Sequence, residues 1–176
     1  ATKGNDNDDD NDDKGNDDDD DNNTKNKNEE KEIKRLTNNP LRLAVLRLGM
    51  TELKGTSMYN YGTQNGRFDC AYCGEELFYS DGKFDSKSGW PSFWRSANDN
   101  AMAYKREFDG RIECKCKTCN SHLGHVFMDG PRESSVDIDV LNSKPYSDPV
   151  SKVGGPNGRL PRFCINGACL NLKEEK

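Results

Sequence analysis

Apolar residues are nearly absent from the first part of the chain and recur in patterns after it. Residues 1–32 consist almost entirely of Asn, Asp, Glu, Lys and Gly, with Ala1 as the single apolar residue. A segment of this kind cannot bury enough surface to offset the entropy that is lost on ordering. We therefore expect a disordered, acidic, low-complexity tail over residues 1–32 and one folded domain over residues 33–176.

A short helix is predicted at the start of the folded domain. Asn39 and Pro40 resemble a helix start, with Asn as the cap and Pro at the first helical position. The apolar stripe that follows has helical spacing, at Leu41, Ala44, Val45 and Leu48. Because Gly49 is a natural stop, we expect a helix over residues 40–48 that packs on the domain.

Short apolar runs separated by Gly, Asp and Ser clusters begin at Arg67 and predict strands. The candidate strands are Arg67–Asp69, Glu76–Tyr79, Arg111–Lys115, His125–Phe127 and Arg162–Leu172. The fold class that follows is mainly β, as a small antiparallel sheet domain with a short N-terminal helix. Residues 132–161 hold four of the seven prolines without clear periodicity, which predicts an inserted loop.

Charge and cysteine usage narrow the classes of protein. The tail carries 14 Asp and Glu against 5 Lys, whereas the rest has 21 Lys and Arg against 17 Asp and Glu. An acidic tail is thus attached to a mildly basic domain. No run of ~18 apolar residues is present, so no membrane span is expected. The seven cysteines are odd in number, which favours metal binding and a reducing intracellular compartment over a secreted disulfide scaffold.

Four cysteines form two Cys-x-x-Cys pairs, at Cys70, Cys73, Cys116 and Cys119. Two residues between ligands let both thiolates reach one ion from a tight turn, and Gly74 suits the first turn. Two such turns complete a tetrahedral four-thiolate site, which is typical of one structural zinc ion. Iron in the same ligands and a pair of disulfides remain alternatives. A closed shell leaves no position for substrate, so this metal would stabilise the fold.

A further cysteine lies in an alternating segment near the C-terminus. In a strand, Phe163 and Ile165 face one way, and Arg162, Cys164 and Asn166 share the other face. A nearby cation lowers the pKa of a thiol and increases its thiolate fraction. The alternative is a buried cysteine that serves as a small hydrophobe.

The segment Arg-Phe-Cys-Ile-Asn resembles the catalytic strand of the B-type methionine sulfoxide reductases. Three further blocks resemble the same family in the same order, at residues 70–74, 83–93 and 116–127. Four ordered motifs are far more specific than any one of them. The resemblance covers residues 40–172 and implies a small β fold of the β-tent type, with zinc on the four cysteines.

The resemblance implies reduction of the R epimer of methionine sulfoxide, mainly in proteins, as repair of oxidative damage. Cys164 would attack as the nucleophile and become a sulfenic acid. His122 and His125, the only histidines, would supply the proton, because histidine can be recharged near pH 7. A structural role and zinc ligation are rival interpretations of this histidine pair.

The remaining site residues shape the substrate pocket. Trp90 offers a flat apolar wall for the substrate methyl, and Phe127 adds to this wall. By residue match, Asn166 and Arg162 help to hold the site. A tryptophan in the core is the alternative for Trp90. The family has a much shorter connection where residues 132–161 lie, which bears on substrate access.

Regeneration of the cysteine is expected to need an external thiol, either thioredoxin or another reductant. Many relatives carry a resolving cysteine just before the Gly-Trp-Pro-Ser-Phe block, where this chain has Ser88. The spare thiols are Cys114, of unknown reach, and Cys169, which a straight strand would place ~17 Å from Cys164. We expect a monomer without a nucleic-acid partner, with the cytoplasm favoured and an organelle left open.

Two other functions fit parts of the sequence. A zinc-stiffened β binding module would use the same small fold without catalysis, and a redox sensor would use only the thiol chemistry. The cysteine strand together with the histidine pair favours the reductase, because a binding module needs neither. Turnover of a peptide with methionine-R-sulfoxide in the presence of dithiothreitol separates the three.

Overall fold

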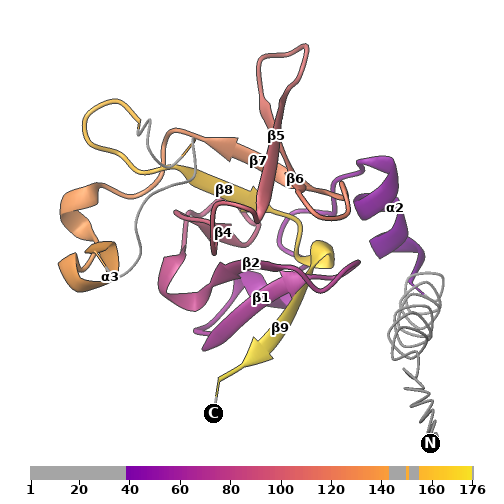
Figure 1. The fold of residues 1–176 in the computed structure, drawn as a ribbon, viewed down its shortest axis with the longest axis horizontal. Coiled ribbons are helices and arrows are strands. Elements are labelled where there is room, and N and C mark those ends of the chain that lie inside the picture. Colours follow the sequence, from indigo (N-terminus) through magenta and orange to yellow (C-terminus); the bar gives the residue numbers. More distant parts are fainter. Residues whose placement is uncertain (1–38, 143–149, 151–154, 176) are drawn as a thin grey trace, which may run out of the picture.

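The computed structural model describes residues 39–142, 150 and 155–175. The expected disordered tail lies outside the described residues, as do residues 143–149 and 151–154 of the predicted inserted loop. Two antiparallel sheets form the domain, which confirms the mainly β fold class (Figure 1). No helix among the described residues is long and apolar enough to cross a membrane.

The smaller sheet has three strands and the larger has six. The smaller sheet has the order β2 (Glu76–Tyr79), β1 (Gly66–Cys70), β9 (Leu170–Glu174). The larger sheet has the order β3 (Lys83–Phe84), β4 (Ser92–Phe93), β8 (Arg162–Ile165), β7 (His122–Phe127), β6 (Ile112–Cys116), β5 (Met102–Arg106). The chain enters the larger sheet at β3 and returns to the smaller one only at β9.

Phenylalanine side chains from both sheets form the core between them. Phe78 of β2 stacks on Phe93 of β4 with ring centroids 4.2 Å apart, and Phe163 of β8 meets Phe78 edge-on at 5.7 Å. These rings and Phe68 are fully buried. Each such ring removes a large apolar area from water, so this cluster fixes β8 and the site it carries.

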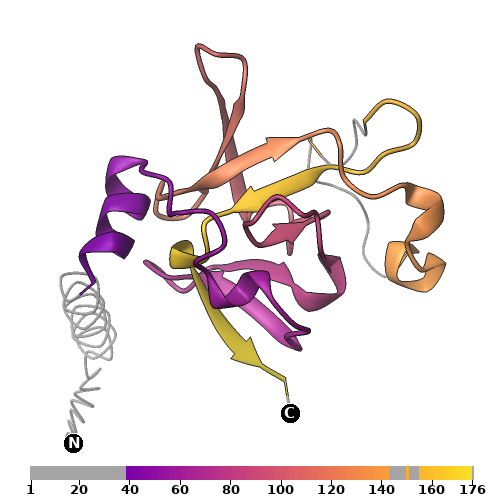
Figure 2. The same cartoon turned by 180° about the vertical axis from the view of Figure 1, so that it is seen from behind.

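Helix α2 (Pro40–Leu48) has the predicted bounds. The Asn39 side chain accepts a hydrogen bond from the backbone of Arg42, and Gly49 ends the helix in the left-handed region at φ 69°. The predicted apolar stripe is wrong in part. Val45 is buried as expected, but Leu41 and Leu48 are exposed, and Leu46, which is outside the stripe, is buried. The helix packs against the turn that follows β8 (Figure 2).

Most predicted strands are found within a residue or two of the expected positions. The single strand predicted over residues 162–172 is wrong, because the chain turns at the 3-10 helix η4 (Gly167–Cys169) between β8 and β9. The Glu52 carboxylate accepts hydrogen bonds from the N–H groups of Gly167 and Ala168 at 2.7 and 2.9 Å. Strands β3, β4 and β5 were not predicted.

The predicted inserted loop contains regular structure. Its described part includes the 3-10 helix η3 (Glu133–Ser135) and the helix α3 (Ile138–Asn142). Leu141 packs with Trp94 and Leu160 in a second, smaller apolar cluster, and the Arg95 guanidinium donates to the carbonyl oxygen of Val140 at 2.8 Å. This part of the predicted inserted loop therefore includes short helices, and Val140 and Leu141 pack in the smaller cluster, whereas Ile138 is exposed. Two further 3-10 turns are η1 (Met58–Asn60) and η2 (Ser80–Gly82).

Candidate active site and metal centre

Cys164 lies in the middle of a row of polar side chains across the larger sheet. Its Cα pairs with Ser92 on β4 and with His125 on β7. Side chains directly opposite each other on neighbouring strands share one face and lie close together. Phe163 and Ile165 are buried in the core, whereas Cys164 is half-buried. The strand thus turns the thiol away from the core, as the alternation of β8 predicts.

A β-bulge brings the two histidines together. In a regular strand His122 and His125 would point to opposite faces, because they are three residues apart. The register shifts between Cys114 and Lys115 of β6, so β7 accommodates an extra residue at that point. The two histidine rings lie 5.6 Å apart as a result.

Gly124 makes the close approach of β7 to β8 possible. A Cβ atom at this position would clash with the backbone carbonyl oxygen of Cys164. The glycine of the His-Leu-Gly-His motif therefore has a packing role, since any larger residue would push the histidines away from the thiol.

Each histidine is held by a carboxylate. His122 is buried, and its Nδ1 lies 2.7 Å from Glu113 on β6. Its Nε2 is buried and has no hydrogen-bond partner among the described residues. His125 is held through Nε2, 2.9 Å from Glu107. A ring nitrogen bound to a carboxylate carries the proton, which fixes the tautomer of a neutral imidazole.

The surroundings of Cys164 act on its pKa in opposite directions. Burial raises the pKa above its ordinary value, whereas the hydrogen bond to Ser88 and the charge of Arg162 lower it. The Cys164 thiol donates to the Ser88 hydroxyl at 3.7 Å. Burial is the largest of these effects, so the net result is a pKa of the Cys164 thiol above its ordinary value.

Arg162 is anchored rather than free. Its guanidinium donates to both carboxylate oxygens of Asp129, at 2.8 and 3.0 Å, and lies over the Phe127 ring with 4.4 Å to the centroid. Phe127 and Arg162 are register partners on β7 and β8. The pair places a cation and an aromatic wall next to the thiol on the same face, two residues along the strand.

Trp90 is half-buried and connects to the thiol through Ser88. The Ser88 hydroxyl accepts from the backbone N–H of Trp90 and donates to its carbonyl oxygen, both at 3.3 Å. The indole N–H donates to the backbone oxygen of Glu52 at 3.2 Å. These contacts place the Trp90 backbone beside Ser88, while the indole is held by the N-terminal segment.

Asn166 follows β8 and is buried. Its amide donates to the Leu123 carbonyl oxygen at 3.0 Å and accepts from the backbone of Glu52 at 2.9 Å. The predicted row of cation, thiol and amide on one strand face is therefore incomplete, because the amide is engaged in backbone contacts. The acidic side chains that hold the site carry no motif signal and were not predicted: Glu52, Glu107, Glu113 and Asp129.

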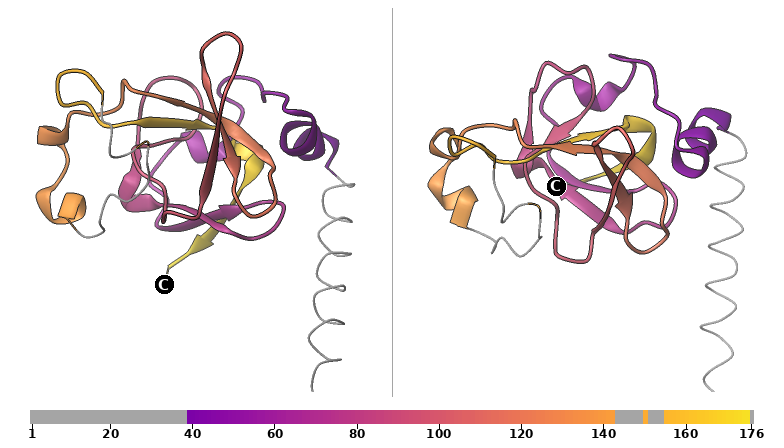
Figure 3. Two further views of the ribbon diagram at one scale, coloured as in Figure 1. Left: turned by 45° about the horizontal axis from the view of Figure 1, so that its top comes forward. Right: turned by 90° about the horizontal axis from the view of Figure 1, so that it is seen from above.

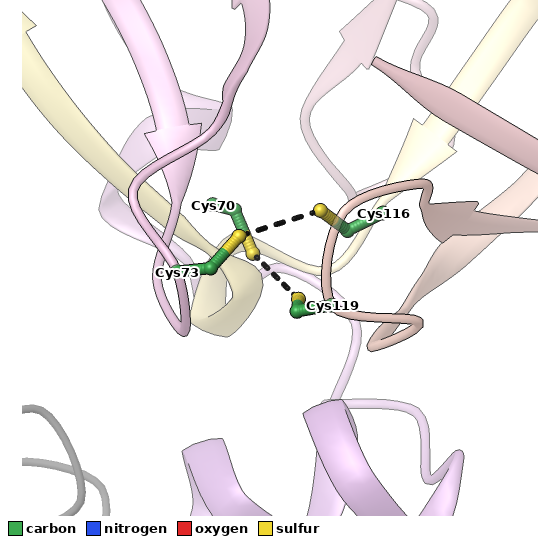
Figure 4. A group of neighbouring side chains, drawn as sticks. All are labelled: Cys70, Cys73, Cys116 and Cys119. Atoms are coloured by element: carbon green, nitrogen blue, oxygen red, sulfur yellow. Dashed lines mark hydrogen bonds between the residues drawn. The ribbon is translucent and has the colours of Figure 1, made fainter. Parts of the chain in front are cut away.

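The four predicted metal ligands converge from the two sheets (Figure 4). The Sγ atoms of Cys70 and Cys119 lie 3.7 Å apart and those of Cys73 and Cys116 3.6 Å apart, with all four within 4.8 Å of one another. Bonds of about 2.3 Å in a tetrahedral zinc site separate neighbouring sulfurs by about 3.8 Å. The four residues therefore fit a tetrahedral metal ion.

The two metal-binding turns have the same backbone design. Gly74 and Asn120 each follow the second cysteine of a pair and have positive φ, at 78° and 59°. Each donates its N–H to the carbonyl oxygen of the first cysteine, at 2.9 and 2.8 Å. The predicted turn at Gly74 is confirmed, and Asn120 is the counterpart that the sequence analysis did not identify.

Both spare cysteines are buried in the core. Cys169 donates its thiol to the carbonyl oxygen of His122 at 3.2 Å, and burial raises its pKa well above the ordinary value. Cys114 pairs with Gly124 in the sheet, one position along from the Glu113–His125 pair. Its side chain therefore points to the face opposite Cys164.

Comparison with known proteins places the chain in a family. The sequence matches the SelR domain over residues 38–147. It is 38% identical over 150 residues to the peptide methionine sulfoxide reductase MsrB of Methanosarcina barkeri, covering 84% of this chain and 87% of the relative. The MsrB of Pseudomonas fluorescens is 36% identical, with 76% and 86% covered, and the peptide methionine sulfoxide reductase 2 of Saccharomyces cerevisiae is 34% identical, with 77% and 71% covered.

A small antiparallel β domain with a half-buried thiol paired across strands with a histidine, and with a separate four-cysteine cluster, fits an oxidoreductase that uses a thiol. Together with the similarity to these relatives, this establishes the family. The chain belongs to the B-type peptide methionine sulfoxide reductases.

Proposed function

We propose that the chain reduces methionine-R-sulfoxide, mainly in proteins, by attack of the Cys164 thiol on the sulfoxide sulfur. The observation that carries this proposal is the cross-strand pair of Cys164 and His125, with Ser88 in contact with the thiol. The sulfoxide oxygen passes to Cys164, which becomes a sulfenic acid, and methionine is released. The cysteine sulfur is oxidised and the substrate sulfur is reduced by the same two electrons.

The test is turnover with separate epimers. The purified enzyme should release methionine from a peptide with methionine-R-sulfoxide in the presence of dithiothreitol, and should leave the S epimer intact. Equal reduction of both epimers contradicts the proposed stereochemistry, and reduction of neither contradicts the function.

The histidines would supply the proton that the departing oxygen needs. His125 lies directly across from Cys164, and in the protonated imidazole the Nε2–H of His122, which has no partner among the described residues, would be a buried donor to the sulfoxide oxygen or to a water molecule. Buried polar atoms are satisfied in nearly all folded proteins, so this nitrogen is expected to gain a partner when substrate binds.

Replacing His125 with alanine should lower the turnover number by about 100-fold, because a positioned proton donor contributes at least this much. His122→Ala should also lower it and should destabilise the fold more, since His122 is buried against Glu113. Steady-state kinetics and thermal melts separate the two effects. Unchanged kinetics in both variants removes the proton-donor role.

The substrate methyl would lie against Trp90, with Phe127 as a second apolar surface. The indole is fixed by its hydrogen bond to Glu52, and Phe127 is fixed beneath Arg162. Rigid apolar walls of this kind select the methyl group over the polar oxygen, which then faces the histidines.

We infer that an external thiol, thioredoxin or another, regenerates Cys164. The position where many relatives carry a resolving cysteine holds Ser88, and both spare cysteines are in the core. The oxidised cysteine therefore has no thiol beside it. Oxidised proteins and a thiol reductant are the partners, and a reducing compartment, with the cytoplasm favoured, suits this chemistry.

Ser88→Cys should create the missing internal route. The Ser88 hydroxyl oxygen lies 3.7 Å from the Cys164 sulfur, so a thiol there needs only a small rotamer change to form a disulfide. After one equivalent of sulfoxide, thiols are counted under denaturing conditions. The natural enzyme should lose one thiol, trappable as a sulfenic acid, and the variant should lose two.

The control for this experiment is the location of any disulfide. Peptide mapping of Ser88→Cys should find a bridge between Cys164 and the introduced cysteine, and dimedone should label Cys164 only in the natural enzyme. Loss of two thiols in the natural enzyme, with a bridge from Cys164 to Cys114 or Cys169, contradicts regeneration by an external thiol.

We propose zinc as the metal held by Cys70, Cys73, Cys116 and Cys119. A closed thiolate shell favours zinc by ligand softness and geometry. The ion would supply no chemistry to the reaction and would act on the fold alone. Cys70 and Cys73 belong to the β1 region and Cys116 and Cys119 to the β6–β7 region, so the ion would connect the two sheets.

A further inference from the structure

A cavity of about 440 Å³ lies beside Ser88, whose hydroxyl contacts the Cys164 thiol. Two of its lining residues belong to the surroundings of the thiol, namely Ser88, which contacts the sulfur, and Arg162, two residues away on β8. The rest of the lining includes Asp85, Asp129 and Arg159. The cavity is thus a polar extension of the proposed active site, and neither Trp90 nor Phe127 lines it.

One cation of this cavity, Arg159, has no ion pair with a carboxylate of the described residues, although the charge of Asp129 acts on it from a longer distance. Asp129 is engaged by Arg162, and Asp85 is engaged by Lys87, which does not line the cavity. Among the described residues no carboxylate forms an ion pair with Arg159. Its Nη1 donates to the carbonyl oxygen of Gly130 at 2.9 Å, which fixes the guanidinium and leaves other N–H donors available.

The inserted segment builds this wall of the cavity. Residues 130–131 and 159–160 are held together by the hydrogen bonds from Gly130 to Leu160 and from Leu160 to Pro131, at 2.9 and 2.8 Å. Leu160 is buried against Trp94 and Leu141 of α3. The segment over residues 155–161 leads directly into β8 (Figure 3). The wall therefore rests on a packed apolar cluster, and Arg159 has a defined position.

We propose that this cavity binds the carboxylate of an acidic side chain of the oxidised polypeptide, close in sequence to its methionine sulfoxide. The inference rests on the proposed reduction of protein-bound sulfoxide. A polypeptide substrate must extend past the thiol on at least one side, and a cavity beside Ser88 and Arg162 lies on such a path. A guanidinium already oriented by the backbone recognises a carboxylate with two hydrogen bonds.

The test compares three peptides that differ only next to methionine-R-sulfoxide, with Glu, Gln or Lys at that position. Single turnovers with excess reduced enzyme and no reductant isolate the sulfoxide step. The Glu peptide should react about threefold to tenfold faster than the Gln peptide at low concentration, and the Lys peptide should be slowest. The preference should weaken as the salt concentration rises.

Three variants identify Arg159 as the source of the preference. In Arg159→Gln the ratio between the Glu and Gln peptides should fall to about one, and in Arg159→Glu the Lys peptide should become the best substrate. Arg132→Gln is the matched control, because Arg132 is an exposed arginine on the same segment that does not line the cavity, and its ratio should match the natural enzyme. Metal content and circular dichroism confirm that each variant is folded.

The outcomes separate this proposal from the proposed function. Reduction of all three peptides at equal rates overturns the cavity proposal and leaves the function intact, whereas reduction of none overturns the function. The second half-reaction is tested with a neutral and a carboxylate-bearing thiol on oxidised enzyme. A charge dependence found only there, and lost in Arg159→Gln, assigns the carboxylate to the reductant and overturns the proposal.

Discussion

Cys164→Ser is expected to lower methionine sulfoxide reduction by at least about 1000-fold, since loss of a nucleophile removes most catalysis. A serine hydroxyl stays protonated near neutral pH and is a much weaker nucleophile than a thiolate. The substitution is nearly isosteric on a half-buried strand face, so folding should be unaffected. Turnover with a methionine-R-sulfoxide peptide measures the loss.

Cys169→Ser is the matched control for this experiment. Cys169 is five residues away and buried, and a serine there can still donate to the carbonyl oxygen of His122. Its activity should stay within a few-fold of the natural enzyme. Substantial turnover by Cys164→Ser, or loss of activity in Cys169→Ser with the fold intact, would move the nucleophile to another cysteine.

Removal of the metal is expected to abolish the cooperative unfolding transition. Structural zinc contributes about 10–16 kcal/mol of binding free energy in small zinc domains, and this energy is available only in the folded state. Here the ligands join β1 of one sheet to β6 of the other, next to the buried Phe68 and Leu123. Without the ion, four closely spaced thiols remain between the sheets.

Thermal melts before and after treatment with a strong chelator measure this effect, and added zinc should restore the transition. Cys116→Ser should behave like the chelated protein, whereas Cys114→Ser, two residues away on the same strand, should keep its metal. Metal analysis distinguishes zinc from iron. Purified protein with no metal, intact thiols and a cooperative melt would contradict the structural role.

The four-cysteine cluster is also connected, through the chain, to the histidines that we propose as proton donors. Cys119 is followed by Ser121, whose hydroxyl lies 3.2 Å from the Cys119 sulfur, and then directly by His122. Loss of the turn would therefore release the beginning of β7, which carries both histidines.

Local patterns in the sequence were sufficient for some elements. Helix α2 was predicted with correct bounds, because Asn39 and Gly49 cap it through contacts within a few residues. The two cysteine turns were predicted for the same reason, since ligand spacing is a property of one turn. Strand β8 begins at the predicted residue, because the alternation of the apolar residues Phe163 and Ile165 with polar ones indicates a strand with one buried face.

Long-range contacts determined the structure of the segments that local patterns did not predict. The chain after Ile165 reads as a continued strand, but the buried Glu52 carboxylate binds the backbone of Gly167 and Ala168 and turns it into η4. The inserted segment lacks clear periodicity, yet Leu141 and Leu160 find a partner in Trp94, which lies far from them in sequence. The residues that are neighbours in sequence carry no pattern that would predict either contact.

The sequence by itself determined which groups we expect to carry chemistry: the thiol, the two histidines, the tryptophan and the four candidate metal ligands. It could do so because those residue types are rare in this chain and are set in ordered motifs. Only the tertiary structure decided their mutual geometry, through the bulge that brings His122 and His125 to one face and the registers that place His125 beside Cys164. Strand pairing is a property of the whole sheet, and therefore the carboxylates that hold the histidines, and the cavity beside the thiol, appear only once the chain is folded.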